Sequence, residues 1–228
     1  MRLFGRPYAA FLFDMDGTLI NSIASANKVW TEWAKRHGLD PQPILQVMHG
    51  VRAIDTIRGL NVPGMDVECE AELLTQAEID AVEGIIPIRG AVELLHALPV
   101  DRWAVVTSAP RELAIHRLEA AGVPRPRVMV AAEDVTRGKP APDGYLLAAR
   151  QLEVEAGQCL VWEDTLAGAS AGEAAGMDVI LISATHHEPL QTRHPVVVDY
   201  TGMTASADGD GMVTLTLKPQ HVGPIPIA

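Results

Sequence analysis

The chain has 228 residues, of which 48% are hydrophobic, and a formal net charge of −11 at pH 7. This apolar content is enough for one large domain, or for a medium domain that carries a smaller insert. The negative charge argues against nucleic-acid binding, which requires a basic surface, but it permits a local basic pocket for one phosphate group. The two cysteines, Cys69 and Cys159, form neither a disulfide framework nor a zinc motif.

The first predicted element is a buried strand over the short apolar run Tyr8–Phe13. It ends at a glycine-containing turn with the sequence Asp14-Met-Asp-Gly-Thr18. The run is too short for a signal peptide, and no segment has the ~20 apolar residues that cross a bilayer. We therefore expect a cytoplasmic protein that binds neither membranes nor nucleic acid, with a monomer as the favoured state.

Residues 20–86 have a different character, because they contain helical patterns and no convincing strand. The apolar spacing of Trp30 and Trp33 indicates that both side chains pack inside this region. We therefore expect a small helical insert of residues 20–86 in a catalytic core made of residues 1–19 and 87–228. The predicted helices of the insert are Ala24–His37, Pro43–Met48, Ala53–Gly59 and Glu68–Val82.

From residue 90 onward, apolar strand patterns alternate with helical ones. This alternation predicts an α/β fold with a doubly wound parallel sheet and crossover helices. The pattern of residues 196–217 predicts one or two edge strands, with a hairpin turn at Asp208-Gly-Asp-Gly211. Residues 218–228 carry no informative pattern. The strands are predicted at Trp103–Thr107, Val128–Ala132, Cys159–Trp162 and Asp178–Ile182, and the helices at Gly90–Ala97, Arg111–Ala121, Asp143–Leu152 and Thr165–Ala175.

Polar side chains follow several of these predicted strands. In open α/β sheets, ligands bind beyond the carboxyl ends of the strands, so we expect these side chains to converge in one crevice. The residues are Asp14 and Asp16 after the first strand, Thr107 and Ser108 after the second, Lys139 in the loop before the helix at 143–152, and Glu163 and Asp164 after a later strand.

This set of side chains suits phosphoryl transfer with Mg²⁺, which prefers oxygen ligands. Two carboxylates, Asp14 and Asp164, and the backbone carbonyl of Asp16 are the candidate metal ligands. Glu163 is a candidate for direct ligation or for a partner of metal-bound water, and the sequence leaves both open. The side chains of Thr107 and Lys139 and the amide of Ser108 are candidates for holding the phosphoryl oxygens, although Thr107 and Ser108 could also cap the following helix.

The two aspartates after the first strand have separate predicted roles. Asp14 is the candidate nucleophile, which would form an aspartyl-phosphate. Asp16 is the candidate general acid and base, which would protonate the leaving alkoxide and then take a proton from the attacking water. A calcium-loop interpretation of the same residues fails, because Ser25 stands where such a loop has glutamate.

Four motifs in chain order resemble the haloacid dehalogenase superfamily: Asp14-Met-Asp-Gly-Thr18, Thr107-Ser108, Lys139 within Gly-Lys-Pro-Ala-Pro-Asp, and Glu163-Asp164-Thr165 with Gly168. The resemblance implies a Rossmann-like core and assigns the insert to the small helical cap of that superfamily. One departure is Asn21-Ser22, where relatives often have Asp-Ser, which removes a charge near the cap hinge.

The segment Lys28–Ile57, with Trp33-Ala-Lys-Arg-His-Gly and Met48-His-Gly, further resembles bacterial hexose-phosphate and glycerol-phosphate phosphatases. This resemblance implies a magnesium-dependent phosphomonoester hydrolase for small sugar or polyol phosphates. Two side chains of the insert, His49 and Arg52, are candidates for substrate contacts, and a solvated helix-to-helix turn is the equally weighted alternative. The pair His186-His187 is interpreted as part of a surface loop.

Other functions of related chemistry stay open to different degrees. Asp16 argues against a dehalogenase, and the absence of a lysine near the Met48–Gly50 loop argues against a phosphonatase. A phosphomutase differs mainly in retaining the intermediate, and the sequence leaves that alternative open. A non-enzymatic receiver module also uses Asp, Thr or Ser, and Lys, but its phosphate-accepting Asp usually follows a middle strand and no cap follows it.

Overall fold

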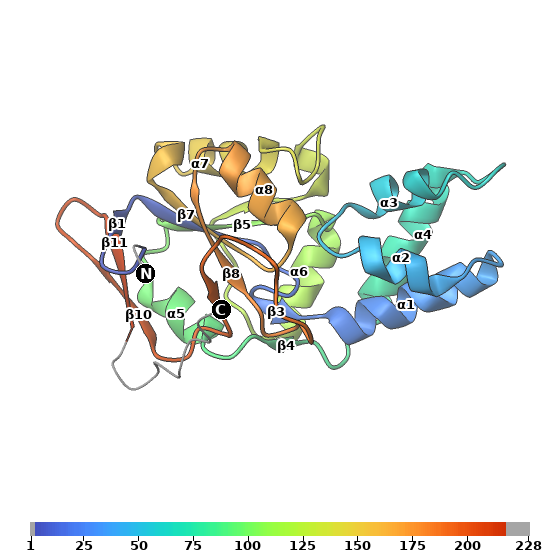
Figure 1. The fold of residues 1–228 in the computed structure, drawn as a ribbon, viewed down its shortest axis with the longest axis horizontal. Coiled ribbons are helices and arrows are strands. Elements are labelled where there is room, and N and C mark those ends of the chain that lie inside the picture. Colours follow the sequence, from blue (N-terminus) through green and yellow to red (C-terminus); the bar gives the residue numbers. More distant parts are fainter. Residues whose placement is uncertain (1–2, 218–228) are drawn as a thin grey trace.

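The computed structural model describes residues 3–217, so residues 1–2 and 218–228 lie outside the described part. A six-stranded parallel sheet forms the centre of the core, in the order β6-β5-β2-β7-β8-β9 (Figure 1). This arrangement confirms the predicted α/β doubly wound fold. The strands are β2 (Ala10–Phe13), β5 (Trp103–Val106), β6 (Val128–Val130), β7 (Cys159–Glu163), β8 (Asp178–Ile182) and β9 (Val196–Val197).

Each face of the sheet carries its own helices because successive residues of a strand point to opposite faces. Phe11 and Phe13 of β2 belong to the cluster under α5 (Ala91–Ala97) and α6 (Arg111–Ala120). The opposite face packs against α7 (Asp143–Gln151) and α8 (Leu166–Ala174). Buried aromatic rings fill the first cluster: Phe13 stacks on Trp162 with ring centroids 5.7 Å apart. Phe13 and Trp162 directly precede Asp14 and Glu163, so this stacked pair lies at the strand ends where the polar residues begin.

Four helices form a separate lobe beside the core (Figure 1). They are α1 (Ile23–Arg36), α2 (Pro41–Val47), α3 (Ala53–Leu60) and α4 (Val67–Asp80). Trp30 and Trp33 are both buried in the hydrophobic cluster of this lobe. Asp40 and Asp66 cap the N-termini of α2 and α4 through hydrogen bonds to backbone amides, as these residue types commonly do.

Two short strands join the lobe to the core. β3 (Ile20–Asn21) pairs antiparallel with β4 (Ile86–Pro87), so the outgoing and returning chains lie side by side. The predicted boundary at residues 20 and 86 falls within this ribbon. The division into a cap, residues 20–86, and a core, residues 1–19 and 87–228, stays a prediction, and we keep the name cap for that segment.

The C-terminal strands differ from the expected arrangement. β9 joins the edge of the main sheet, but β10 (Met203–Ala207) and β11 (Val213–Leu217) form a second sheet with β1 (Pro7–Tyr8), in the order β1-β11-β10. The first predicted strand therefore divides at Ala9 between two sheets, because an apolar run carries no information about its partner. The hairpin turn predicted at residues 208–211 is confirmed, since Asp208 accepts hydrogen bonds from the amides of Asp210 and Met212. Within residues 3–217, no helix is long and apolar enough to cross a membrane.

Candidate active site

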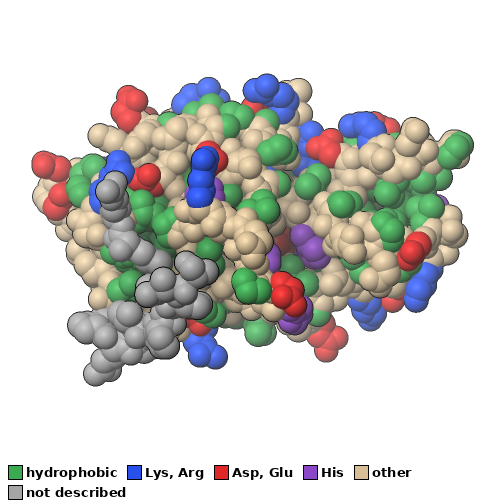
Figure 2. All heavy atoms as spheres, in the orientation of Figure 1, with side chains coloured by type: hydrophobic (Ala, Val, Ile, Leu, Met, Phe, Trp, Pro, Cys, Tyr) green, Lys and Arg blue, Asp and Glu red, His purple; other side chains and the backbone are tan. Residues whose placement is uncertain are grey.

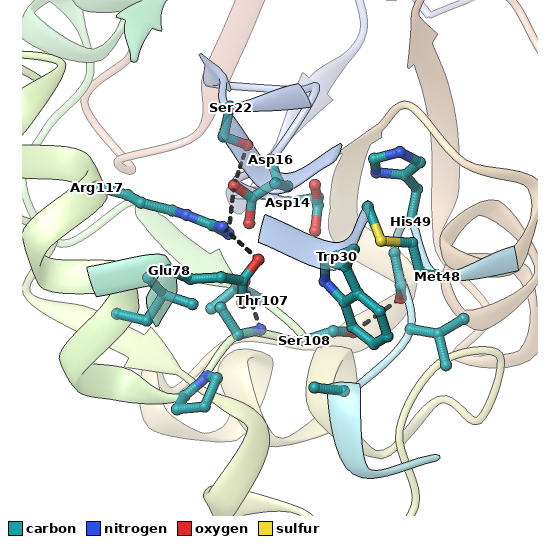
Figure 3. A pocket seen from close by; sticks show the side chains of 17 residues that line it. Asp14, Asp16, Ser22, Trp30, Met48, His49, Glu78, Thr107, Ser108 and Arg117 are labelled. Atoms are coloured by element: carbon teal, nitrogen blue, oxygen red, sulfur yellow. Dashed lines mark hydrogen bonds and ion pairs between the residues drawn. The ribbon is translucent and has the colours of Figure 1, made fainter. Parts of the chain in front are cut away.

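Polar residues at the ends of β2 and β5 line a crevice between the core and the cap: Asp14, Asp16, Thr107 and Ser108. Figure 3 shows Asp14 and Asp16 on one side of it and Trp30, Met48 and His49 of the cap on another. Parallel strands place their carboxyl ends along one edge, which is why residues from distant motifs converge there. The crevice is also lined by Ser22, Ala26, Gly50, Val51, Ala53, Glu78, Ala109, Pro110, Leu113 and Arg117.

A buried lysine links the first and fourth motifs. Lys139 Nζ donates to Asp14 Oδ1 at 2.5 Å, to Glu163 Oε1 at 2.6 Å and to the carbonyl of Val106 at 3.1 Å. Burial alone would lower the pKa of Lys139, but the carboxylates of Asp14 and Glu163 raise it above its ordinary value. The lysine is therefore a fixed positive charge beside the Asp14 carboxylate.

Glu163 is fully buried, and both of its oxygens have protein partners. Oε1 accepts from Lys139 and from the Tyr145 hydroxyl at 2.7 Å, while Oε2 accepts from the Asp164 amide at 3.1 Å and the Thr165 hydroxyl at 3.1 Å. A Cβ atom at Gly168 would lie 1.7 Å from Oε1, so only glycine leaves room for the carboxylate at the start of α8. These contacts favour a role in orienting Lys139 over direct metal ligation.

Three buried carboxylates cluster at the strand ends, and Asp14 and Asp164 are the two that would hold a cation. Oxygens of Asp14, Glu163 and Asp164 lie within 4.8 Å of one another. Burial raises the pKa of Asp14 to about 7, with Lys139 lowering it and Glu163 and Asp16 raising it. Burial and the neighbouring carboxylates of Asp14, Glu163 and Asp16 raise the pKa of Asp164 well above its ordinary value. Asp14 and Asp164 therefore resist ionisation, and a bound divalent cation would stabilise their ionised forms.

The surroundings of Asp164 also favour a bound cation. Among the described residues, its buried Oδ1 has no hydrogen-bond partner. Its Oδ2 packs against Gly17, where a Cβ atom would lie 1.9 Å away, and where the backbone φ of +80° also requires glycine. An unpaired carboxylate oxygen in a dry pocket is costly unless a cation occupies the space beside it.

Asp16 lies at the mouth of the crevice and is more exposed than Asp14. Its Oδ1 accepts from the Ser22 hydroxyl and from Arg117 Nη1, the latter at 3.0 Å. Within residues 3–217, Oδ2 of Asp16 has no hydrogen-bond partner. One oxygen is therefore held by the protein and the other faces free space in the crevice.

Thr107 and Ser108 line the crevice and also have structural contacts. Thr107 Oγ1 accepts from the Ala109 amide at 3.0 Å and so holds the turn before α6, whereas the N-cap of that helix is Pro110, with no side-chain cap. The Ser108 hydroxyl donates to the carbonyl of Gly50 at 2.8 Å and so contacts the cap. The Ser108 amide, which was the predicted phosphate donor, remains available for that role.

The two cap candidates separate in the structure. His49 lines the crevice and hydrogen-bonds Asn27 Oδ1 through Nε2 at 2.9 Å. Arg52 does not line it: its guanidinium bonds Asp55 at 2.6 Å and the carbonyl of Val135 at 3.1 Å, on the far side of Ser108. The structure therefore brings the predicted site residues of the core together, with His49 in the crevice and Arg52 in a neighbouring hollow that Thr107, Ser108 and Lys139 also line.

Several residues beside the site were not anticipated from the sequence. Arg117 and Glu78 line the crevice, and Tyr145 supports Glu163. His186 and His187 lie in a loop after β8, as predicted, and His187 is exposed, but His186 is partly buried with Nε2 3.9 Å from Asp164 Oδ2. Histidine side chains are visible where the cap meets the core (Figure 2). His186 closely follows β8, and that position at the carboxyl edge of the sheet could have identified it.

Comparisons with known proteins agree with this geometry. Residues 8–176 match the family of haloacid dehalogenase-like hydrolases. The chain belongs to this family. It is 42% identical over 183 residues to hexitol phosphatase A of Escherichia coli (strain K12), covering 78% of this chain and 85% of that protein. It is 35% identical over 187 residues to glycerol-1-phosphate phosphohydrolase 2 of Saccharomyces cerevisiae, covering 77% and 75%.

A solved structure of a hydrolase from Pseudomonas syringae has the same architecture, with a TM-score of 0.72 at 25% identity over 79% of this chain and 87% of that one. Together these matches confirm the predicted membership in the haloacid dehalogenase superfamily. They also confirm the finer resemblance to sugar and glycerol phosphate phosphatases. The chain is therefore an enzyme of the hydrolase class.

Proposed function

We propose that this hydrolase is a magnesium-dependent phosphomonoesterase that forms an aspartyl-phosphate on Asp14. Its substrates are phosphate esters of small sugars or polyols whose only charged group is the phosphate. The observation that carries the proposal is the contact of the buried Lys139 with Asp14, which lines the crevice together with Asp16. A nucleophilic carboxylate, a fixed cation and a half-exposed acid are the groups that phosphoryl transfer through a covalent intermediate requires. Hexitol phosphatase A and glycerol-1-phosphate phosphohydrolase 2 support the substrate class by their names.

In the first step, a carboxylate oxygen of Asp14 attacks phosphorus as the bond to the substrate alkoxide breaks. Asp16 donates its proton to that leaving oxygen. In the second step, Asp16 takes a proton from a water molecule that attacks the phosphorus, and the aspartyl-phosphate bond breaks to release inorganic phosphate. Asp14 and Asp16 return to their starting states, so the cycle balances.

Three other groups are assigned to the phosphoryl oxygens: the Lys139 ammonium, the Thr107 side chain and the Ser108 amide. Glu163 keeps Lys139 charged and in place through the 2.6 Å contact. When bound, Mg²⁺ would be held by Asp14, Asp164 and the backbone carbonyl of Asp16, and would supply positive charge that relieves the repulsion between carboxylate and phosphate.

The charges of the crevice favour an uncharged substrate body. Among the described residues that line it, Arg117 is the one arginine or lysine, and its guanidinium is shared by Asp16 and Glu78. Burial lowers the pKa of His49, with Arg117 and His186 adding to the effect and Asp16 opposing it, so His49 is mostly neutral near pH 7. A neutral imidazole suits a hydroxyl group, and a second anion would meet no free cation here.

A matched substrate pair tests this proposal. Glucitol 6-phosphate and 6-phosphogluconate differ in one terminal group, a hydroxymethyl against a carboxylate. We expect kcat/KM to favour glucitol 6-phosphate by at least about tenfold, because the carboxylate would meet Glu78 and Asp16 in a partly dry crevice. Equal values for the pair, or a preference for the acid, would contradict the uncharged substrate class.

The reaction itself is tested by product analysis. We expect stoichiometric inorganic phosphate from the preferred substrate, loss of turnover in EDTA and recovery with Mg²⁺. Recovery of an isomeric phosphate ester without free phosphate would instead establish a phosphomutase. A stable phospho-aspartate without turnover would indicate a receiver module.

A further inference from the structure

A buried ion pair crosses from the cap to the core and ends on Asp16. Arg117 of α6 donates through Nη2 to Glu78 Oε1 of α4 at 2.9 Å and through Nη1 to Asp16 Oδ1 at 3.0 Å. Arg117 is 4% exposed and Glu78 is 6% exposed. Figure 3 shows the continuous chain of contacts from Ser22 through Asp16 and Arg117 to Glu78. The guanidinium of Arg117 therefore joins Glu78, which is 39 residues away in sequence, to Asp16, which is 101 residues away.

Stability alone does not account for this arrangement. Replacing a buried ion pair by apolar side chains of similar volume is often neutral or stabilising, whereas removing one partner leaves an uncompensated charge. Burial opposes the charge of Arg117, yet Asp16 and Glu78 raise its pKa above the ordinary value. Burial raises the pKa of Glu78, and Arg117 offsets only part of that shift, since Asp16 adds negative charge nearby. The three groups therefore depend on one another.

The geometry leaves one oxygen of Asp16 for chemistry. Arg117 and Ser22 both bind Oδ1, and this fixes the carboxyl plane with Oδ2 turned to free space. The guanidinium is a planar fork that could engage both oxygens of one carboxylate. With Nη2 bound to Glu78, the fork is divided between two carboxylates, and only Nη1 contacts Asp16.

We propose that Arg117 is a positioning residue for Asp16, and that Glu78 makes this positioning depend on the cap lying against the core. The inference rests on the proposed function, in which Asp16 is the general acid and base. When the cap is docked, Glu78 holds one nitrogen of the fork and Asp16 Oδ2 stays available to the leaving oxygen. When α4 moves away, the whole fork is free to bind Asp16, and the acid is withdrawn from the reaction.

The test is a double-mutant cycle read through leaving-group dependence. Single-turnover phosphorylation is measured with glycerol phosphate, a poor leaving group, and with p-nitrophenyl phosphate, a good one. We expect Arg117→Gln to slow the first reaction by about 10- to 100-fold and the second by less than about threefold, because only the first needs the acid. In an Asp16→Asn background, Arg117→Gln is expected to add less than about twofold, since its effect passes through Asp16.

Glu78→Gln keeps an acceptor for Arg117 but removes the charge. We expect Glu78→Gln to slow phosphorylation by glycerol phosphate about three- to tenfold, and to affect phosphorylation by p-nitrophenyl phosphate much less. The matched control is Arg111→Gln, because Arg111 starts the same helix and pairs with Asp134 away from the crevice. This control is expected to leave the leaving-group dependence unchanged.

Equal slowing of both substrates by Arg117→Gln would overturn the proposal, and so would an undiminished effect in the Asp16→Asn background. Should Arg117→Gln fail to fold, Arg117→Lys provides the same readout, because lysine keeps the charge but reaches one carboxylate at a time. Failure of the proposed function looks different: Asp16→Asn alone would then retain full activity on the poor leaving group.

Discussion

The surroundings of Asp14 and the seam between cap and core are both rich in buried charge, but they are built differently. Around Asp14, the charged groups stand at the ends of β2 and β7 or in the loop that precedes α7, and the hydrogen bonds run to Lys139 and to backbone amides. At the seam, side chains of separate helices meet, as in the contact of Glu78 with Arg117.

This difference separates two kinds of function. A group supported by the sheet keeps its position whatever the cap does, and this suits a nucleophile and its lysine. A group at the seam has its partner only while the cap is docked, and this suits steps that should wait for a bound substrate. Ser108 is an intermediate case, because its backbone belongs to the core while its hydroxyl binds Gly50 of the cap.

The largest expected effect comes from the sheet-supported group. Asp14→Asn should lower kcat by about 10⁴-fold or more while the circular dichroism spectrum is unchanged, because an amide is no nucleophile. Steady-state kinetics at saturating Mg²⁺ measure it. The control is Asp143→Asn, since Asp143 is a carboxylate that pairs with Arg137 at the surface. Activity of the Asp14 variant within tenfold of the parent would contradict the mechanism.

The second prediction concerns Asp16, which belongs to both regions. Asp16→Asn should slow the phosphorylation of Asp14 about 10²- to 10⁴-fold when the substrate has a poor leaving group, because the general acid is lost. Metal binding should persist, since the backbone carbonyl of Asp16 is the proposed ligand. Single-turnover rates with alkyl and aryl phosphates measure the difference. An equal loss for both kinds of leaving group would count against the acid role.

How far the sequence predicts each region follows from the same contrast. The parallel sheet and the convergence of Asp14, Lys139 and Asp164 could be predicted, because strand ends share one edge whatever the details of packing. The burial of Glu163 behind Lys139 could not, since it depends on the space left by Gly168 in three dimensions. The sequence therefore left metal ligation and positioning as alternatives for Glu163.

The seam was less predictable. The helices of the cap were expected close to their observed bounds, but helical periodicity does not tell which residue of one helix meets which residue of another. In the sequence, Arg117 is one of several charged residues of a predicted helix, and its partner Glu78 lies 39 residues away. The different positions of His49 and Arg52 likewise depend on how the turn after Met48 approaches the core.

The third prediction tests the carboxylate at the cation site. Asp164→Asn should weaken Mg²⁺ binding by at least about tenfold and should stabilise the metal-free protein at pH 8. Burial raises the pKa of Asp164 above its ordinary value of 3.8. Above that pH the native state retains a proton that the unfolded state releases, so the carboxyl destabilises the fold increasingly as pH rises.

The measurements are calorimetric titration with Mg²⁺ and urea unfolding in EDTA at pH 8 and pH 4. The stability difference should be smaller at pH 4, which is close to the ordinary pKa of 3.8, because the unfolded state then also carries the proton part of the time. Glu163→Gln is the comparison variant, and it should weaken Mg²⁺ binding less, because both Glu163 oxygens already have protein partners. A larger loss of affinity for Glu163→Gln than for Asp164→Asn would assign direct ligation to Glu163.

The smallest expected effects separate the two cap candidates. His49→Ala should change the ranking of a panel of sugar and polyol phosphates, with individual kcat/KM values shifting by about three- to tenfold, because His49 lines the crevice. Arg52→Ala should lower kcat/KM for all substrates by a similar factor of about two- to fivefold, since Arg52 holds the cap to Val135. Activity on a small generic phosphate should be largely retained by His49→Ala, because the groups around Asp14 are untouched. An unchanged substrate ranking in His49→Ala would contradict a substrate contact of His49. A changed substrate ranking in Arg52→Ala would contradict a purely structural role of Arg52.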